Sequence, residues 1–287
     1  MSSAPDPSWP MTGPAPERGP AAPVTRPAAD APIPNLPIRA PELDEARRLA
    51  FGAAFSSGGD LYDAVRPAYP DAAVDFLIPP GARDAVDLGA GTGILTLQLA
   101  ARGLSTTAVD PSADMLAQLH LKSAAPTTLR ASAEDTGLPD ASFDLATYAQ
   151  AWHWVDVPRA SAETARILRP GGRLGLIWNQ LDVTVGWVHR LSRIMHAGDV
   201  HRPEFVPDIG PEFSGLESLQ VRWEQPVTPE HLIDLAKSRS YYLRAGTETR
   251  ARVEGNLVWY LYEHLGLQPG QELGLPYYTH AWRAHRP

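Results

Sequence analysis

The feature that most constrains this chain is a glycine-rich turn between a short apolar run and a helical pattern. Asp84-Ala-Val-Asp-Leu88 has the composition of a buried strand, and Gly89-Ala-Gly-Thr-Gly93 follows it directly. Apolar residues at helical spacing come next, and this helix is expected to end at Gly103. A strand, a glycine turn and a helix in this order are typical of open α/β sheets, in which ligands bind beyond the carboxyl ends of the strands.

The same alternation continues along the chain. Short connections between strands and helices favour a mostly parallel sheet with helices on both faces. We expect further strands at about 106–110, 127–131, 143–148 and 172–178, with helices after Pro111 and at 157–168.

The pattern changes after Asn179. A helix is expected at 184–196, and two more strands at about 219–223 and 271–284, separated by helices near 230–243 and 248–265. The prediction is therefore an α/β fold: a Rossmann-like, doubly wound, seven-stranded sheet, mostly parallel, with an antiparallel last strand. Residues 42–287 are expected to form this domain, with a helical cap insertion at 180–215 over the carboxyl edge of the sheet.

Residues 1–41 differ in composition from the rest. They hold 12 of the 29 prolines, lack phenylalanine, and carry three acidic and three basic residues, so their charge sums to zero. Such a segment buries too little apolar surface to offset the entropy of ordering it. We expect a disordered Pro/Ala-rich tail.

Composition excludes several classes of protein. Without cysteine, the chain has neither disulfides nor thiolate-ligated metals, and its net charge of −8 argues against nucleic-acid binding. No apolar run is long enough for a membrane helix, so a cytoplasmic protein without a membrane partner is expected. Only Lys122 and Lys237 are lysines, whereas 23 of the 25 basic residues are arginines, which indicates a GC-rich bacterial genome.

The residues around the glycine turn limit its ligand. A dinucleotide fingerprint would need a small residue where Ile94 stands, and a phosphate-binding Walker loop would need Gly-Lys-Ser/Thr, which is absent. Asp87 would repel a pyrophosphate and attract a cation. Asp110, at the end of the second strand, is placed to accept hydrogen bonds from both hydroxyls of a ribose. A cationic or zwitterionic nucleoside fits this set.

Several short motifs follow one another along the chain. They are Asp87-Leu-Gly-Ala-Gly-Thr-Gly93, Ala108-Val-Asp110, Ala133-Glu-Asp135, Leu138-Pro-Asp-Ala-Ser-Phe-Asp144 and Leu168-Arg-Pro-Gly-Gly-Arg-Leu174. With these motifs in this order, the chain resembles the class I S-adenosylmethionine-dependent methyltransferases. Two further motifs, Ala149-Gln-Ala-Trp-His-Trp154 and Tyr62-Asp-Ala-Val-Arg-Pro-Ala-Tyr-Pro70, resemble their small-molecule branch (methyltransferase type 11), which includes trans-aconitate-type enzymes.

The resemblance implies a donor site for S-adenosylmethionine, with S-adenosylhomocysteine as the product. Asp87 would lie near the ammonium of the donor, Asp110 would hold the ribose, and Gln150 would close over the methionine end. Ser132 departs from the family pattern, in which a small acid often precedes the alanine. The remaining expected cofactor-binding residues are Tyr62, Arg66, Gly89, Ala90, Gly91, Gly93, Pro111, Met115, Ala133 and Glu134.

The expected reaction is an in-line SN2 methyl transfer to a small-molecule acceptor, placed in bacterial secondary metabolism. A general base is needed only where the acceptor is protonated at working pH, and His153 is the candidate, because it follows the fourth strand. The alternative is that His153 and its flanking tryptophans only pack, or cap the next helix.

Other interpretations stay open. The chain could bind the donor without transferring a methyl group, as a sensor, a scaffold or a non-methylating catalyst; a nicotinamide oxidoreductase is disfavoured by Ile94 and Asp87. No metal is expected, since the spacings of His189, His196 and His201 form no i, i+4 pair. The acceptor, the methylated element and the oligomeric state are not determined by the sequence. The later aromatic residues suit a core more than a substrate pocket: Trp187, Tyr241, Tyr242, Trp259, Tyr260 and Tyr262.

Overall fold

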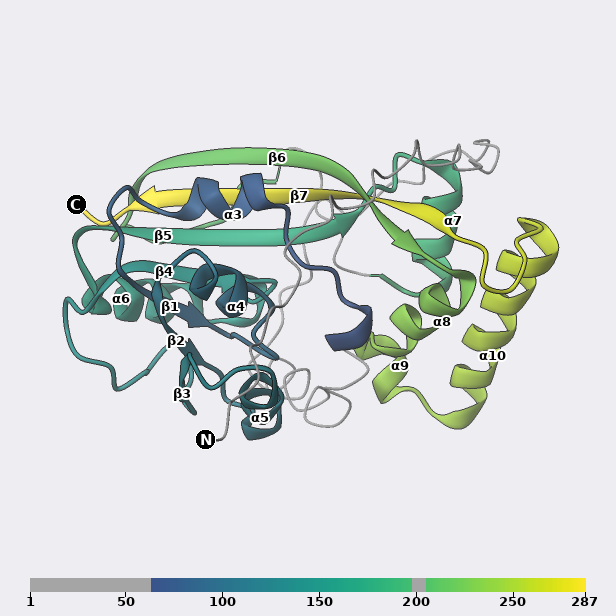
Figure 1. Ribbon diagram of the computed structural model, residues 1–287, viewed down its shortest axis with the longest axis horizontal. Helices are drawn as coiled ribbons and strands as arrows, with labels where there is room; N and C mark the ends of the chain where they lie inside the picture. Colours follow the sequence, from purple (N-terminus) through teal and green to yellow (C-terminus); the bar gives the residue numbers. More distant parts are fainter. Residues whose placement is uncertain (1–62, 198–204) are drawn as a thin grey trace, which may run out of the picture.

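A computed structural model of the 287-residue chain describes residues 63–197 and 205–287. Within them, seven strands form one sheet in the order β3-β2-β1-β4-β5-β7-β6 (Figure 1). The strands are β1 (Asp84–Leu88), β2 (Ser105–Val109), β3 (Thr127–Leu129), β4 (Phe143–Ala149), β5 (Leu168–Leu181), β6 (Ser214–Val227) and β7 (Leu273–His285).

The sheet is doubly wound, as expected. β1 pairs in parallel with β2 on one side and β4 on the other, so the chain reverses its direction of winding at β1. β7 runs antiparallel between β5 and β6. The mostly parallel sheet with an antiparallel last strand is thereby confirmed.

Helices cover both faces of the sheet. Side chains of α3, α4 and α5 pack on one face, and those of α6 on the other. Alternate strand residues supply the two cores: Ala85 and Ile177 face α3 and α4, whereas Val86 and Trp178 face α6. These helices are α3 (Asp71–Leu77), α4 (Ile94–Ala100), α5 (Ala113–Lys122) and α6 (Val157–Ile167).

A second group of helices lies at the end of the sheet where β5 and β6 finish and β7 begins (Figure 1). Its members share an apolar core with one another, in which Leu232, Leu257 and Leu261 are fully buried. The expected cap segment 180–215 contributes α7; the other helices come from the connection between β6 and β7. They are α7 (Gly186–Ile194), α8 (Pro229–Lys237), α9 (Ser240–Arg244), α10 (Thr247–Val258) and the π-helix η2 (Trp259–His264).

Several predicted bounds were wrong. β5 and β6 are each 14 residues long, about twice the predicted length or more. β6 is an edge strand whose residues are mostly exposed or half-buried, so apolar periodicity marks only its middle. The helix expected at 230–243 is two helices, because the chain turns at Ser238 and Arg239.

The expected tail, residues 1–41, and the first part of the expected domain, 42–62, lie outside the described residues. In the part of the chain that the structure describes, no helix combines the length and the apolar character needed to cross a bilayer.

Candidate functional site

The glycine turn follows β1 at the reversal point of the sheet, where β1 and β4 run side by side in parallel although they are not consecutive in the chain. The amides of Gly89 and Ala90 both donate to the carbonyl of Val109, at 2.8 and 3.0 Å, which fastens the turn to the end of β2. Open α/β sheets bind their ligands at this kind of reversal point.

The three glycines of the turn differ in what surrounds them, although all have a positive φ. A Cβ on Gly89 would lie 2.6 Å from the Cβ of Ala151, and one on Gly93 would lie 2.3 Å from Cδ1 of Leu119. A Cβ on Gly91 would meet no heavy atom of residues 63–197 or 205–287 within 4 Å. Gly89 and Gly93 are therefore required by packing, whereas Gly91 borders open space.

Asp110 is joined to the same turn. Its two carboxylate oxygens accept hydrogen bonds from the amides of Gly91, at 2.9 Å, and of Ser112, at 2.8 Å. Burial raises the pKa of Asp110, while the two amides oppose that rise. A carboxylate has about four acceptor positions, so two stay available for ribose hydroxyls.

Asp87 lies deeper, on β1, and is 1% exposed. Its oxygens accept hydrogen bonds from the hydroxyls of Thr96, at 2.7 Å, and Thr147, at 2.9 Å. Burial raises its pKa to about 6, against the lowering effect of these two hydroxyls and with a further rise from the charge of Asp110. A cation bound nearby would offset the cost of this buried charge.

The residues expected near the adenine are only partly brought together. Met115 is buried on α5, whose first turn is capped by Ser112, and Ala133 is buried in the core on the α6 face of the sheet. Pro111 is exposed. One carboxylate oxygen of Glu134 accepts a hydrogen bond of 3.0 Å from the amide of Asp156, which directly precedes α6. Part of the hydrogen-bonding capacity of Glu134 is therefore already used.

A segment at the start of the described chain, residues 63–69, lies against the glycine turn and α4. Asp63 accepts hydrogen bonds from the hydroxyl of Thr92, at 2.7 Å, and from Nζ of Lys122, at 2.6 Å. The amide of Tyr69 donates to Gln98, whose own amide group donates back to the Tyr69 carbonyl. The motif from Tyr62 to Pro70 contains Asp63, but the sequence assigned no role to this residue. Tyr62, expected to bind the cofactor, lies outside the described residues.

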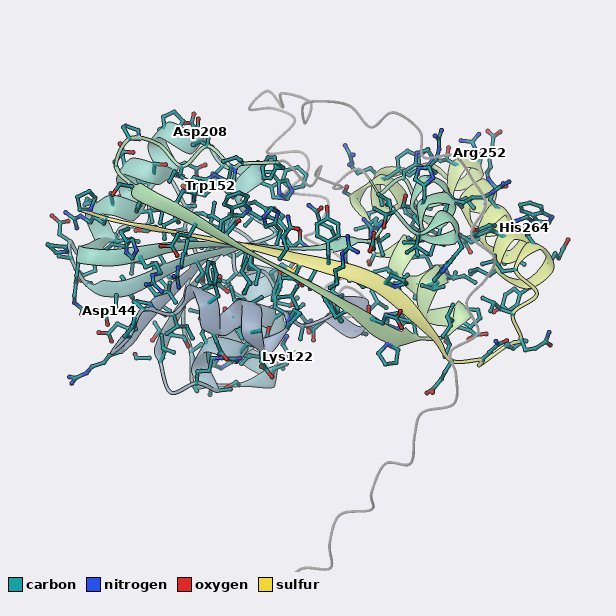
Figure 2. The ribbon with its side chains drawn as sticks, turned by 90° about the horizontal axis from the view of Figure 1, so that it is seen from above. Lys122, Asp144, Trp152, Asp208, Arg252 and His264 are labelled. Carbon is teal, nitrogen blue, oxygen red and sulfur yellow. The ribbon has the colours of Figure 1, made fainter. Side chains whose placement is uncertain are left out.

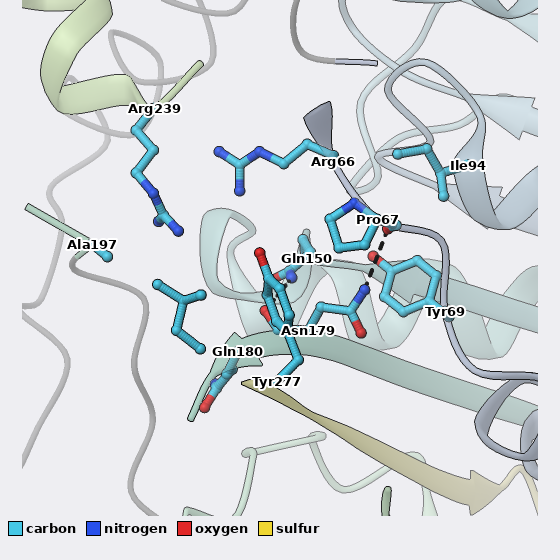
Figure 3. A pocket seen from close by; sticks show the side chains of 11 residues that line it. Arg66, Pro67, Tyr69, Ile94, Gln150, Asn179, Gln180, Ala197, Arg239 and Tyr277 are labelled. Atoms are coloured by element: carbon cyan, nitrogen blue, oxygen red, sulfur yellow. Dashed lines mark hydrogen bonds between the residues drawn. The ribbon is translucent and has the colours of Figure 1, made fainter. Parts of the chain in front are cut away.

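Beside the turn is a pocket lined by both polar and apolar residues, among them Arg66, Ile94, Gln150, Asn179, Arg239 and Tyr277 (Figure 3). Gln150 follows β4 with a positive φ of 56° and donates to the carbonyl of Asn179 at 2.7 Å. Arg66 and Gln150 were expected in the donor site. Asn179, Arg239 and Tyr277 carry no motif and were missed, because they meet only through tertiary packing.

Comparison with known proteins identifies the chain. Residues 86–176 match the family model described as a methyltransferase domain. An uncharacterized methyltransferase of Mycobacterium tuberculosis is 42% identical over 237 residues, which cover 82% of this chain and 95% of the relative. The chain belongs to the class I S-adenosylmethionine-dependent methyltransferases.

Two further similarities agree with this membership. A protein of Schizosaccharomyces pombe described as methyltransferase-like is 32% identical over 209 residues, covering 68% of this methyltransferase and 81% of the relative. The solved structure of a protein from Anaeromyxobacter dehalogenans, described as a type II methyltransferase, superposes with a TM-score of 0.57 at 30% identity, covering 77% of this chain and 97% of that one.

The residues present in this methyltransferase fit the cofactor of the family. The position where Gly91 lacks a side chain is open, and the Asp110 carboxylate is held at its amide. A nucleoside beside Gly91 would place its ribose hydroxyls within reach of that carboxylate. Tight packing at Gly89 and Gly93 keeps the turn in one conformation for such a ligand.

His153 lies in a short 3₁₀ helix, η1 (Trp152–Trp154), directly after β4. Its Nδ1 accepts a hydrogen bond of 3.3 Å from Nε1 of Trp178. The preceding Trp152 is buried and donates from its indole to the carbonyl of Asp208, at 2.7 Å; both residues are labelled in Figure 2. The His153 imidazole and the indoles of Trp178 and Trp152 therefore each have a hydrogen-bonding partner within the protein.

The aromatic residues of the second group of helices, α7 to η2, mostly pack in the apolar core of that group. Trp187 and Tyr260 are buried, and the Tyr260 hydroxyl donates to the Trp187 carbonyl at 2.9 Å. Trp259 is 42% exposed. Across residues 63–197 and 205–287, no three His, Asp or Glu side chains are arranged to hold a metal ion; His201 is not among these residues.

Proposed function

We propose that this methyltransferase transfers the methyl group of S-adenosylmethionine to a small-molecule acceptor by in-line SN2 displacement. The observation that carries the proposal is the arrangement at the end of β1. The amide of Gly91 donates to the Asp110 carboxylate, and Ile94, at the start of the helix that follows the same turn, lines the pocket together with Gln150.

The chain's own residues would fix the donor in three places. The Asp110 carboxylate would accept hydrogen bonds from the ribose hydroxyls. Gly91, which has no side chain, would let the backbone of the turn approach the donor closely. Asp87, on β1, would supply negative charge near the turn. Bound S-adenosylmethionine supplies a methyl group on a sulfonium, which is already activated for displacement. The protein's main task is therefore to hold the acceptor in line with that methyl group and to keep water out.

The walls of the pocket suit this task because they are fastened to one another. Asn179, on β5, donates to the carbonyls of Pro67 and Ala68, at 3.3 and 3.2 Å. Together with the bond from Gln150 to Asn179, this ties β4, β5 and the 63–69 segment around one space. A preorganised wall lowers the entropy cost of orienting an acceptor.

A proton-accepting role for His153 stays a prediction. Indole N–H groups only donate, so the neutral ring must carry its proton on Nε2 while Nδ1 accepts from Trp178. To act as a base, His153 would have to take the acceptor's proton at Nδ1 and give up that hydrogen bond. An acceptor that is already deprotonated would need no base.

We also place the acceptor in bacterial metabolism, as a secondary metabolite. The mycobacterial relatives and the arginine-rich composition support a bacterial setting.

Two measurements test the proposal together. Calorimetric titration with S-adenosylhomocysteine should show saturable binding, weakened about 10- to 100-fold in Asp110→Asn, which loses a charged acceptor of hydrogen bonds. Asp114→Asn, an exposed change in the first turn of α5, the helix that follows Asp110, should leave binding unchanged. Incubation with methyl-labelled donor should label small molecules. Binding without any transfer would instead indicate a donor-binding protein.

A further inference from the structure

A hydrogen-bonded chain of three side chains crosses the last three strands of the sheet and ends at the pocket. The indole Nε1 of Trp223, on β6, donates to the hydroxyl of Thr279, on β7, at 2.9 Å. That hydroxyl donates to Oδ1 of Asn179, on β5, at 2.6 Å. Asn179 lies directly opposite Thr279 in the strand pairing and lines the pocket. The chain therefore connects the edge strand of the sheet to the candidate site.

The chemistry of the groups fixes the direction of each bond. An indole nitrogen only donates, so the Thr279 hydroxyl accepts from Trp223 and has its single proton left for the Asn179 oxygen. The NH2 group of Asn179 is thereby turned toward the 63–69 segment. There it donates to the carbonyls of Pro67 and Ala68, which can only accept; Figure 3 shows Asn179 and Pro67 side by side. Thr279 thus selects the one orientation of the Asn179 amide that can hold the segment.

Trp223 also supports the pocket by packing. Its indole stacks on the ring of Tyr277, which lies opposite it in the strand pairing, with the ring centroids 5.1 Å apart and the planes inclined by 18°. Tyr277 is 4% exposed and lines the pocket. Trp223 and Thr279 are not themselves lining residues, so they act on the pocket through Tyr277 and Asn179.

The stretch that Asn179 holds has few backbone donors of its own. Residues 67–70 belong to no helix or strand, and two of the four are prolines, which have no amide hydrogen. Side-chain bonds such as those from Asn179 therefore contribute much of what keeps the stretch in place. Because Pro67 and Tyr69 line the pocket, a shift of this stretch would move one of the pocket walls.

We propose that Thr279 and Trp223 are positioning residues of this methyltransferase. Through Asn179 they hold the 63–69 segment, and with it one wall of the pocket, in the arrangement that binds the donor. Without the Thr279 hydroxyl the amide can rotate, the wall is in place in only a fraction of the molecules, and the apparent affinity falls by that fraction. The inference rests on the proposed function, because it takes the donor to bind beside this wall.

Hydrogen exchange tests the hold on the segment without any ligand. Thr279→Val has nearly the same shape but no hydroxyl, and the fragment that contains residues 63–69 should exchange about 2- to 10-fold faster in this variant. Thr279→Ser keeps a hydroxyl and should exchange at the unaltered rate. Thr164→Val is the matched control, because it also removes a buried hydroxyl, one that is bonded to Tyr148 at 2.8 Å on the α6 face of the sheet. It should not change the exchange of this fragment.

Calorimetric titration with S-adenosylhomocysteine tests the effect on the site. Thr279→Val should weaken binding about 3- to 20-fold, since the Asn179 oxygen loses its partner, whereas Thr279→Ser and Thr164→Val should bind as the unaltered protein does. Trp223→Phe keeps a ring to stack on Tyr277 but has no indole N–H, so it should weaken binding by a smaller factor.

A double-mutant cycle shows whether Thr279 acts through Asn179. In Asn179→Leu the amide is absent, so adding Thr279→Val should cause no further loss of affinity. If the two losses multiply instead, Thr279 acts on the site by another route and the inference is overturned.

The outcomes separate this inference from the proposed function. If the unaltered protein does not bind S-adenosylhomocysteine, the proposed function fails, and the exchange measurement still decides whether Thr279 holds the segment. If it binds, and Thr279→Val changes neither the exchange of residues 63–69 nor the affinity, only the positioning role fails. An equal loss of affinity in Thr164→Val would also overturn that role, because it would assign the loss to reduced stability of the fold.

Discussion

The indole nitrogen of Trp178 donates a hydrogen bond of 3.3 Å to Nδ1 of His153. The bond joins the buried face of β5 to the short helix after β4, and it holds the imidazole in one tautomer. His153 therefore has two possible roles that exclude one another. It can take up a proton from the methyl acceptor, or it can serve only as the hydrogen-bond acceptor for Trp178.

Substitution of His153 distinguishes these roles. His153→Ala removes both, whereas His153→Asn keeps an acceptor for the indole but cannot take up a proton. If His153 is the base, both variants should turn over about 10² to 10⁴ times more slowly, with S-adenosylhomocysteine binding retained. Turnover close to that of the unaltered enzyme in His153→Asn would assign the residue to packing.

Replacement of Gly91 tests the position of the donor. Gly91→Ala adds a methyl group in open space at a φ of +55° and should cost about 1–2 kcal/mol of stability through backbone strain. The same methyl group should lower the affinity for S-adenosylhomocysteine at least about tenfold, because it occupies the space assigned to the donor.

Gly81→Ala is its control, since Gly81 has a φ of +78° and also has no atom within 4 Å of the added Cβ. Both variants should lose similar stability in urea denaturation, and only Gly91→Ala should lose affinity. Equal affinities in the two variants would place the donor elsewhere.

The buried carboxyl of Asp87 should make stability depend on pH. Its folded pKa of about 6 exceeds the unfolded value of 3.8, so its protonation favours the folded state at low pH, and this contribution is lost as the pH rises through 6. Relative to Asp87→Asn, the free energy of unfolding should fall by up to about 3 kcal/mol between pH 4 and pH 7. Urea denaturation across this range measures the difference.

Asp87→Asn should therefore be more stable than the unaltered protein at pH 7, yet bind S-adenosylmethionine more weakly, because the donor loses a neighbouring negative charge. Such an exchange of stability for function is common at binding sites. A variant with unchanged donor affinity would show that Asp87 serves the fold alone.

The contact between Asp63 and the glycine turn should control how long the donor stays bound. Asp63→Asn weakens the bonds to Thr92 and Lys122, so S-adenosylhomocysteine should dissociate several times faster in stopped-flow measurements. Asp71→Asn removes an exposed partner of Arg102 instead and should leave the dissociation rate unchanged. Equal rates in the two variants would exclude a retaining role for the 63–69 segment.

Much of the fold could be predicted because its signals are local. The run Asp84–Leu88 and the glycines after it specify a strand and a tight turn whatever the rest of the chain does. The long strands β5 and β6 were underestimated for the opposite reason. Their outer parts are held by pairing with β7, and pairing between distant segments leaves no periodicity in either one.

The candidate site, too, could be predicted from the sequence only in part. Gly91 and Asp110 follow consecutive strands, so parallel pairing must bring them to one edge of the sheet, and the amide of Gly91 does bond to the Asp110 carboxylate. A role for Glu134 at the adenine stays a prediction, and one of its carboxylate oxygens accepts a hydrogen bond from the amide of Asp156. Side-chain direction in a loop depends on its neighbours, which the motif does not specify.

The sequence by itself determined the family fold, the glycine turn and the acidic residues that suit a cationic nucleoside, because each rests on short-range patterns of strand, turn and helix. Only the tertiary structure decided which cations share the pocket. Arg66 and Arg239 belong to segments with no common motif, and they meet because β5, β6 and β7 carry the helical group to the carboxyl edge of the sheet. Residues so far apart in the sequence are brought together by the burial of apolar surface and by the order of the strands. Their local spacing in the sequence does not predict this.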